Sequence, residues 1–163
     1  MEVRSQFGSG TTFTIHLPSV VQEPDLNSTP PRAFSGGTET ILVVDDEPAL
    51  LALVSEILEH EGYSVLRAGS AEEAVRSHEE NLGNLDLLLA DVVLPGMSGV
   101  ELAEHLAGLN SNLAVLHMSG YPDEVILHHG IFQGAISLIE KPFTRTQLAL
   151  RVREALDSAK VPR

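Results

Sequence analysis

Four short, largely apolar runs, each followed by a polar side chain, constrain the fold of this chain more than any other feature. The runs occupy residues 41–44, 87–90, 114–118 and 136–140. The polar residues that follow them are Asp45 with Asp46, Asp91, Ser119 and Lys141. Such runs are typical of strands buried on both faces of a parallel sheet. Because open α/β sheets bind ligands at the carboxyl ends of their strands, the sequence predicts one polar site at that edge.

The segments between these runs carry the signals of helices. Apolar residues recur there at helical spacing. Ser70 with Glu73, and Thr144 with Gln147, have the spacing of capping boxes at helix starts. The predicted helices begin near residues 48, 70, 99, 122 and 144, and a further strand is predicted over residues 64–68. This alternation predicts an α/β fold, a doubly wound five-stranded parallel sheet with helices on both faces.

The polar edge of this sheet has a definite chemical character. Three carboxylates crowded together repel one another and need a compensating cation. A hard ion such as Mg²⁺ is the natural candidate, because it prefers carboxylate, carbonyl and water oxygens. A lysine and a hydroxyl at the same edge add donors for an anionic group. An acid pair, a single acid, a hydroxyl and a lysine therefore predict a site for a phosphoryl group and its metal.

The order and spacing of these residues resemble the receiver domain of two-component response regulators. By this resemblance, Asp45 and Asp46 form the metal-binding acid pair, and Asp91 accepts phosphate from a phosphohistidine. Pro95 and Gly99 correspond to the loop that follows this aspartate. The resemblance also implies a flavodoxin-like sheet with the strand order 2-1-3-4-5.

The resemblance assigns roles to residues after the later strands as well. Ser119 corresponds to the switch hydroxyl, and Lys141 with Pro142 corresponds to the signature lysine and its cis proline. The ammonium of Lys141 and the hydroxyl of Ser119 would each contact a phosphoryl oxygen. Asp91, Lys141 and Ser119 are therefore the expected catalytic residues.

A bound Mg²⁺ would, by the same resemblance, be held by oxygen ligands only. Asp46 and Asp91 would each supply a carboxylate oxygen, and the backbone carbonyl of Val93 would supply a third protein ligand. Asp45 would act mainly through water. The expected metal site thus comprises Asp45, Asp46, Asp91 and Val93.

One position departs from the resemblance. Receivers usually carry Tyr or Phe three residues before the signature lysine, where the ring serves as a rotameric switch; here that residue is Leu138. We expect Ser119, Leu138 and Pro142 to form the switch region. The phosphorylation chemistry should be retained, but the conformational response should be modest and depend on Ser119 and the loop through Tyr121.

The beginning of the chain indicates its wider context. Residues 8–18 resemble the last glycine box and final strand of a histidine-kinase ATP-binding domain. We expect residues 1–18 to be a remnant of such a domain, residues 19–38 to be a flexible linker, and residues 39–160 to be the receiver. The parent would be a hybrid sensor histidine kinase. This chain itself would catalyse only its own aspartyl phosphorylation and dephosphorylation, and would not bind ATP.

Composition limits the partners. With 23 acidic and 10 basic residues, the formal net charge is −13, which disfavours binding to nucleic-acid phosphates. The sequence has no cysteine, and no apolar run approaches the length of a membrane span. We expect a cytoplasmic chain without membrane contact, whose parent could be anchored upstream. The expected partner is a phosphohistidine-bearing kinase or phosphotransfer domain. A weak homodimer could form through the fourth helix, fifth strand and fifth helix, or through the N-terminal segment.

Simpler interpretations exist for each residue and for the whole. Asp46 could cap the helix that begins near Pro48, Lys141 could be a solvated charge, and Ser119 could be a turn residue. A Mg²⁺-dependent phosphohydrolase is an alternative function, but it would need an acid or base at position 93, which is Val93. A receiver-like interaction module that never turns over phosphate is a further alternative, against which the complete set of polar residues argues.

Overall fold

The computed structural model describes residues 2–8, 10–16, 36–81, 84–120 and 137–159. The chain divides into two compact units, residues 1–33 and residues 34–163. Several predicted features lie outside the described residues: the helix near residues 122–129, Tyr121, the start of the strand at 135–140 and most of the linker at 19–38.

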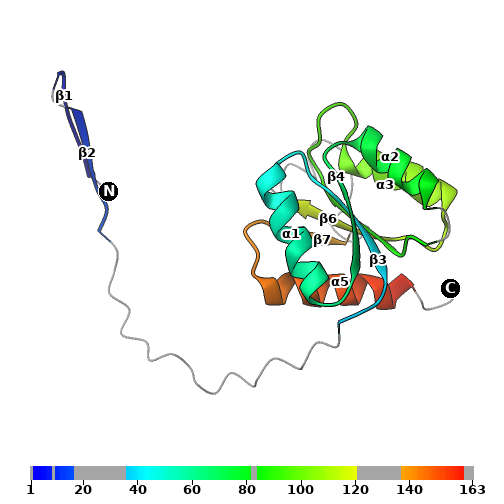
Figure 1. The fold of residues 1–163 in the computed structure, drawn as a ribbon. Helices are drawn as coiled ribbons and strands as arrows, with labels where there is room; N and C mark the ends of the chain where they lie inside the picture. Colours follow the sequence, from blue (N-terminus) through cyan, green and yellow to red (C-terminus); the bar gives the residue numbers. More distant parts are fainter. Residues whose placement is uncertain (1, 9, 17–35, 82–83, 121–136, 160–163) are drawn as a thin grey trace, which may run out of the picture. The chain divides into compact units, whose positions relative to one another are not determined.

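The first unit contains an antiparallel hairpin of β1 (Glu2–Gln6) and β2 (Gly10–Thr14), drawn in blue in Figure 1. Val3 lies opposite Phe13, and Gly8 in the turn has a φ of 81°, a conformation that favours glycine. The resemblance of residues 8–18 to a final strand predicted a strand in the region of β2 and did not predict β1. The structure pairs that strand with β1, which satisfies backbone groups that a lone strand would leave unpaired.

The second unit contains a five-stranded parallel sheet in the order β4-β3-β5-β6-β7 (Figure 1). Its strands are β3 (Thr40–Val44), β4 (Ser64–Ala68), β5 (Leu87–Asp91), β6 (Ala114–Ser119) and β7 (Leu138–Glu140). Counted along this unit, the order is 2-1-3-4-5, so the predicted topology is confirmed. Asp91 and Ser119 are the last residues of their strands and therefore lie at the carboxyl edge of the sheet.

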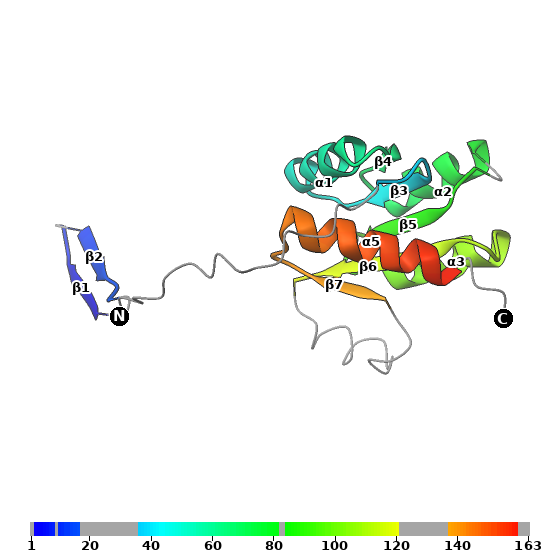
Figure 2. The same cartoon turned by 90° about the horizontal axis from the view of Figure 1, so that it is seen from below.

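Helices cover both faces of this sheet. Those described are α1 (Pro48–His60), α2 (Ala71–Glu80), α3 (Gly99–Leu109) and α5 (Arg145–Ala159). α1 and α5 pack on one face, and α2 and α3 pack on the other (Figure 2). The consecutive residues Ile41 and Leu42 of β3 illustrate the consequence. Ile41 packs with Leu58 of α1, and Leu42 packs with Leu102 of α3, because successive side chains of a strand point to opposite faces.

Two predicted capping boxes position helix starts. Thr144 and Gln147 exchange both expected hydrogen bonds before α5, at 2.8 and 3.2 Å. Before α2, the Ser70 hydroxyl accepts a hydrogen bond from the Glu73 amide, as predicted. The predicted start of α2 is therefore confirmed. The Glu73 carboxylate, however, accepts a hydrogen bond from the amide of Gly69 at 2.7 Å, one residue before the N-cap amide that it would contact in a standard capping box.

Other helix ends rest on similar local contacts. Ser98 and Glu101 form a complete capping box at the start of α3, which our sequence analysis did not identify. At the end of α1, Gly62 adopts a φ of 95°. The amide of Tyr63 then donates to the carbonyl of Leu58, which is the Schellman arrangement that glycine permits.

Candidate functional site

Three carboxylates meet at the carboxyl edge of the sheet. Asp45 and Asp46 follow β3, and Asp91 ends the neighbouring β5. Each offers an oxygen atom, and these oxygens all lie within 4.8 Å of one another. Asp45 is buried, Asp91 is partly buried and Asp46 is exposed, so the cluster opens to solvent on one side. The structure thus brings together the three acids that the sequence placed at one edge.

Lys141 lies between two of these acids. Its Nζ atom is 2.9 Å from Oδ2 of Asp45 and 2.9 Å from Oδ2 of Asp91. Burial acts to lower the pKa of Lys141, but hydrogen bonds and charge interactions with Asp91 and Asp45 outweigh it and raise the pKa. Lys141 therefore stays protonated at neutral pH, and it is not the solvated lysine that was the simpler interpretation.

Backbone contacts fix the position of Lys141. Its amide donates a 2.7 Å hydrogen bond to the carbonyl of Ser119, which joins the ends of β6 and β7. The peptide bond between Lys141 and Pro142 is cis, as the family resemblance implied. Phe143, next along the chain, packs against the core between the sheet, α1 and α5.

Ser119 reaches the same edge from β6. Asp91 is in register with Met118, so Ser119 lies one position further along the neighbouring strand. The Ser119 side chain is buried, with an exposed fraction of 3%. The structure therefore places Ser119 beside the strand that ends in Asp91.

The loop after Asp91 wraps closely over this strand end. The amide of Val93 donates to Oδ1 of Asp91 at 3.3 Å, and the amide of Gly99 donates to the carbonyl of Val92 at 3.0 Å. A Cβ atom added at Gly99 would overlap the carbonyl oxygen of Asp91. A residue without a side chain is therefore required at position 99 for α3 to begin so close to the site.

Asp46 does not act as a helix cap. The N-cap residue of α1 is Glu47, and no side-chain hydrogen bond caps this helix. Oδ1 of Asp45 instead accepts a 2.9 Å hydrogen bond from the Glu47 amide, which orients the buried carboxylate. The exposed carboxylate of Asp46 remains directed at the site rather than at the helix.

Leu138, the position that departs from the family pattern, packs inward. Its side chain is partly buried and contacts Val92 and Val100, beside the loop that follows Asp91. The backbone carbonyl of Leu138 accepts a hydrogen bond from Arg151 of α5 at 3.2 Å. Leu138 thus links the Asp91 loop to β7 without an aromatic ring.

Two buried histidines were not singled out by the sequence. His78 on α2 has an exposed fraction of 0% and His117 on β6 one of 3%. Their ring nitrogens make no hydrogen bond within the part of the chain that the structure describes. Burial lowers the pKa of His117, and the nearby backbone of Gly99 and Ser137 offsets this only in part. Both rings pack as buried core side chains.

Among the described residues, no helix combines the length and apolar character needed to cross a membrane.

The sequence matches the family model of the response regulator receiver domain over residues 41–153. It is 32% identical over 162 residues to sensor kinase CckA of Brucella abortus, covering 94% of this chain and 17% of that protein. It is 37% identical to transcriptional regulatory protein YvrH of Bacillus subtilis, covering 72% of this chain and 48% of the relative. The chain therefore spans only part of these curated relatives.

Solved structures agree with this assignment. The crystal structure of a response regulator receiver domain protein from Clostridium thermocellum has a TM-score of 0.66 and 30% identity, over 75% of this chain and 97% of that one. The receiver domain of the hybrid histidine kinase CckA has a TM-score of 0.61 and 34% identity, over 72% and 98% of the two chains. The fold, the clustered acids and the matched sequence together show that this chain belongs to the response regulator receiver domain family of two-component signalling proteins.

Proposed function

We propose that this chain accepts a phosphoryl group on Asp91 within a histidine-to-aspartate phosphorelay. The observation that carries the proposal is the position of Lys141, whose ammonium joins Asp91 to the buried Asp45. This arrangement keeps one carboxylate partly exposed as a nucleophile and places a fixed cation beside it. A phosphoryl group that arrives at Asp91 would therefore meet positive charge at once.

The acid cluster fits a hard divalent cation such as Mg²⁺. Its donors are carboxylate oxygens, which all lie within 4.8 Å of one another, and the cluster includes no imidazole or thiolate. Asp46, Asp91 and the carbonyl of Val93 would hold the ion, with Asp45 acting through water. When bound, the ion would supply positive charge that offsets the charge of the phosphoryl oxygens. A structural neighbour, TrrA of Thermotoga maritima, was solved in complex with Mg²⁺ and a beryllium fluoride, with a TM-score of 0.63 and 29% identity.

Asp91, Lys141 and Ser119 each have a separate role in the proposed phosphoryl transfer. A carboxylate oxygen of Asp91 attacks the phosphorus of a phosphohistidine, a P–O bond forms, and the P–N bond breaks. The bonding electron pair stays on the imidazole nitrogen of the donor. Lys141 and the Ser119 hydroxyl each hold one phosphoryl oxygen. Slow self-dephosphorylation would be the reaction of the acyl phosphate on Asp91 with water, which releases inorganic phosphate and restores the carboxylate.

The wider context is also proposed. The match to the Brucella sensor kinase covers 94% of this chain, so it cannot be confined to residues 41–153 and must extend into the N-terminal hairpin region. This supports our assignment of residues 1–18 to the end of a histidine-kinase ATP-binding domain, and of the parent to the hybrid histidine kinases. The partner would be a phosphohistidine-bearing kinase or phosphotransfer domain, and the chain would act in the cytoplasm.

The proposal can be tested with the purified chain, Mg²⁺ and a small acyl phosphate as phosphodonor. Intact mass should show one added phosphoryl group, and Asp91→Asn should show none because an amide is a far poorer nucleophile. Asp86→Asn serves as the control, since Asp86 directly precedes β5, at the opposite end of the strand from Asp91, and accepts a hydrogen bond from the Thr40 amide at 2.8 Å. Equal labelling of the wild type and Asp91→Asn would reject the assignment of the acceptor.

A further inference from the structure

Residues 36–39, here called the root segment, lead into β3 and pack tightly on the rest of the second unit. A Cβ atom added at Gly36 would overlap the carbonyl oxygen of Glu61, and one added at Gly37 would overlap the ring of Tyr63. The root segment therefore lies directly on the turn between α1 and β4. The second compact unit therefore includes residues 36–38, which our sequence analysis assigned to the linker at 19–38.

Arg153 of α5 ties the root segment to that helix. Its Nη1 atom lies 3.0 Å from Oε1 of Glu39, and its Nε and Nη2 atoms lie 3.0 and 2.7 Å from Oδ1 of Asp157. The Glu39 carboxylate and the Arg153 side chain are only 13% and 23% exposed. Tyr63 is buried beside them. Solvent screens a pair of this kind less than a surface pair, so the contact holds the root segment firmly on α5.

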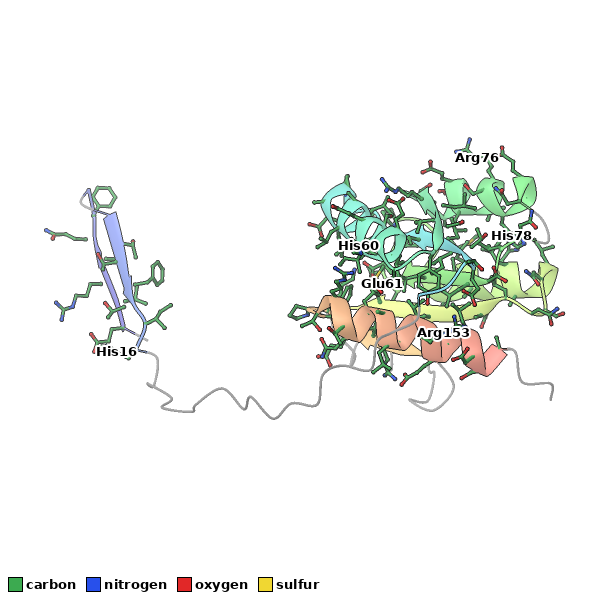
Figure 3. The ribbon with its side chains drawn as sticks, turned by 60° about the horizontal axis from the view of Figure 1, so that its bottom comes forward. His16, His60, Glu61, Arg76, His78 and Arg153 are labelled. Atoms are coloured by element: carbon green, nitrogen blue, oxygen red, sulfur yellow. The ribbon has the colours of Figure 1, made fainter. Side chains whose placement is uncertain are left out.

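α5 is also held at its other end. Nη2 of Arg145 lies 2.8 Å from Oε1 of Glu61 and 2.8 Å from Nδ1 of His60, at the end of α1. Figure 3 shows His60 and Glu61 at this end of α1, and Arg153 further along α5. Glu61 thus contributes its side chain to the contact with α5 and its carbonyl to the contact with the root segment.

A further contact joins α5 to the strand that carries Lys141. Nη2 of Arg151 donates to the carbonyl of Leu138 in β7, at 3.2 Å. β7 ends one residue before Lys141, whose ammonium holds Asp91. A continuous series of contacts therefore leads from the Asp91 site through β7 and α5 to the root segment.

We propose that the root segment is a coupling element, in which Arg153 passes the state of the Asp91 site to residues 36–39. The inference rests on the proposed function, because it requires that the Asp91 site change state. A phosphoryl group at Asp91 competes for Lys141, and any shift of β7 reaches α5 through Arg151. The backbone of Gly36 and Gly37 packs directly on the turn after α1. When α5 shifts, the root segment must therefore either move with it or lose the ion pair between Arg153 and Glu39.

The test uses the full chain with Mg²⁺ and beryllofluoride, a phosphoryl mimic, and follows amide NMR shifts at two places. The amides of Val92, Val93 and Lys141 report the site. The amides of Gly36 and Gly37, and that of Ser64, which donates to the carbonyl of Glu39 at 3.0 Å, report the root segment. In the wild type both groups should shift. In Arg153→Met the site shifts should remain, while the root shifts should be about threefold smaller or less.

Arg67→Met is the matched control. Arg67 pairs with Glu59 at 2.8 Å, but about half of each side chain is exposed, at 46% and 47%, and neither residue takes part in the Arg153–Glu39 ion pair. This variant should keep both groups of shifts. Glu39→Gln keeps the size of the side chain while it removes the charge, so it tests the same contact if Arg153→Met fails to fold.

The results of these experiments distinguish a failure of the proposed function from a failure of the proposed coupling. Absence of shifts at Val92, Val93 and Lys141 would reject the proposed function itself. Shifts at the site without shifts at the root segment would leave the proposed function standing and overturn the coupling. Root shifts that persist in both Arg153→Met and Glu39→Gln, or that disappear equally in Arg67→Met, would also overturn it.

Discussion

The ammonium of Lys141 lies 2.9 Å from Oδ2 of Asp91, the carboxylate to which we assign phosphate acceptance. The same ammonium also contacts Asp45, which is almost completely buried. Lys141 thus has a structural role before any phosphoryl group arrives, because it neutralises a carboxylate that solvent cannot reach. Chemistry at Asp91 and stability of the strand ends therefore depend on one side chain.

Lys141→Met should destabilise the chain, because Asp45 would remain buried without its cation. Loss of one partner of a largely buried pair is expected to cost about 2 kcal/mol here, since Lys141 is still 19% exposed. Mg²⁺ should restore part of this stability by supplying charge at the same cluster. Urea unfolding with and without Mg²⁺ measures both effects. Unfolding midpoints equal to the wild type in the absence of Mg²⁺ would contradict the structural role.

Asp46→Asn should weaken Mg²⁺ binding about tenfold or more, since the exposed carboxylate of the cluster is the ligand that an incoming ion meets first. Glu47→Gln is the control, because Glu47 is adjacent and exposed but its side chain makes no capping bond. Titration of Mg²⁺ against amide shifts gives both affinities. An equal loss in the two variants would indicate a general charge effect instead of a ligand at Asp46.

Acid should destabilise the wild type partly through His117. Burial lowers the pKa of His117 below its usual value of 6.5, so below pH 6.5 the unfolded chain binds a proton that the folded chain does not. Stability therefore falls as the pH decreases through this range, by at most about 1.4 kcal/mol per pH unit for this group. His117→Phe should reduce this dependence as the pH falls below 6.5, the usual histidine pKa.

The exposed His105 provides the comparison for that experiment. A smaller slope of unfolding free energy against pH in His117→Phe than in His105→Gln would assign the effect to the buried ring. Equal slopes in the wild type and His117→Phe would show that other groups account for the acid sensitivity.

Gly99→Ala should disturb the site and the fold together, because its Cβ would overlap the carbonyl oxygen of Asp91. We expect a loss of about 2 kcal/mol in the free energy of unfolding, and slower phosphorylation by a small acyl phosphate. Gly108→Ala is a matched substitution in the same helix, α3, and its Cβ would meet nothing within 4 Å. It should stabilise the chain by up to about 1 kcal/mol. Similar effects of the two substitutions would rule out crowding at Asp91 as the cause.

Leu138→Tyr should enlarge the structural response to beryllofluoride. In the wild type, Leu138 packs against Val92 and Val100 and offers no ring to repack, so the difference in contact energy between the two states is small. Amide shifts across β7 and α5 with and without the mimic should therefore be modest in the wild type and wider in the tyrosine variant. A wide rearrangement in the wild type, with no further change in Leu138→Tyr, would refute the argument from Leu138.

The sequence by itself determined the strands and helix starts of the second unit that the structure describes, and it predicted the residues of the candidate site. A short apolar run such as residues 87–90, with polar residues on either side, is typical of a strand that is buried inside a parallel sheet. Thr144 and Gln147 stabilise a helix start through bonds only three residues apart. Ser98 and Glu101 have the same spacing and could have been found in the same way. Such signals are readable because the interacting groups lie within one turn of the chain.

The tertiary structure alone decided which charges meet. Lys141 and Asp45 are 96 residues apart in the chain, and Arg153 and Glu39 are 114 apart. With 10 basic and 23 acidic residues in the chain, many pairs could satisfy the same pairing rules, so composition cannot choose among them. Strand order, parallel register and the packing of α5 against the turn after α1 select these partners. The physical reason is that local hydrogen bonds depend on sequence spacing, whereas long-range ion pairs depend on where complete strands and helices are packed.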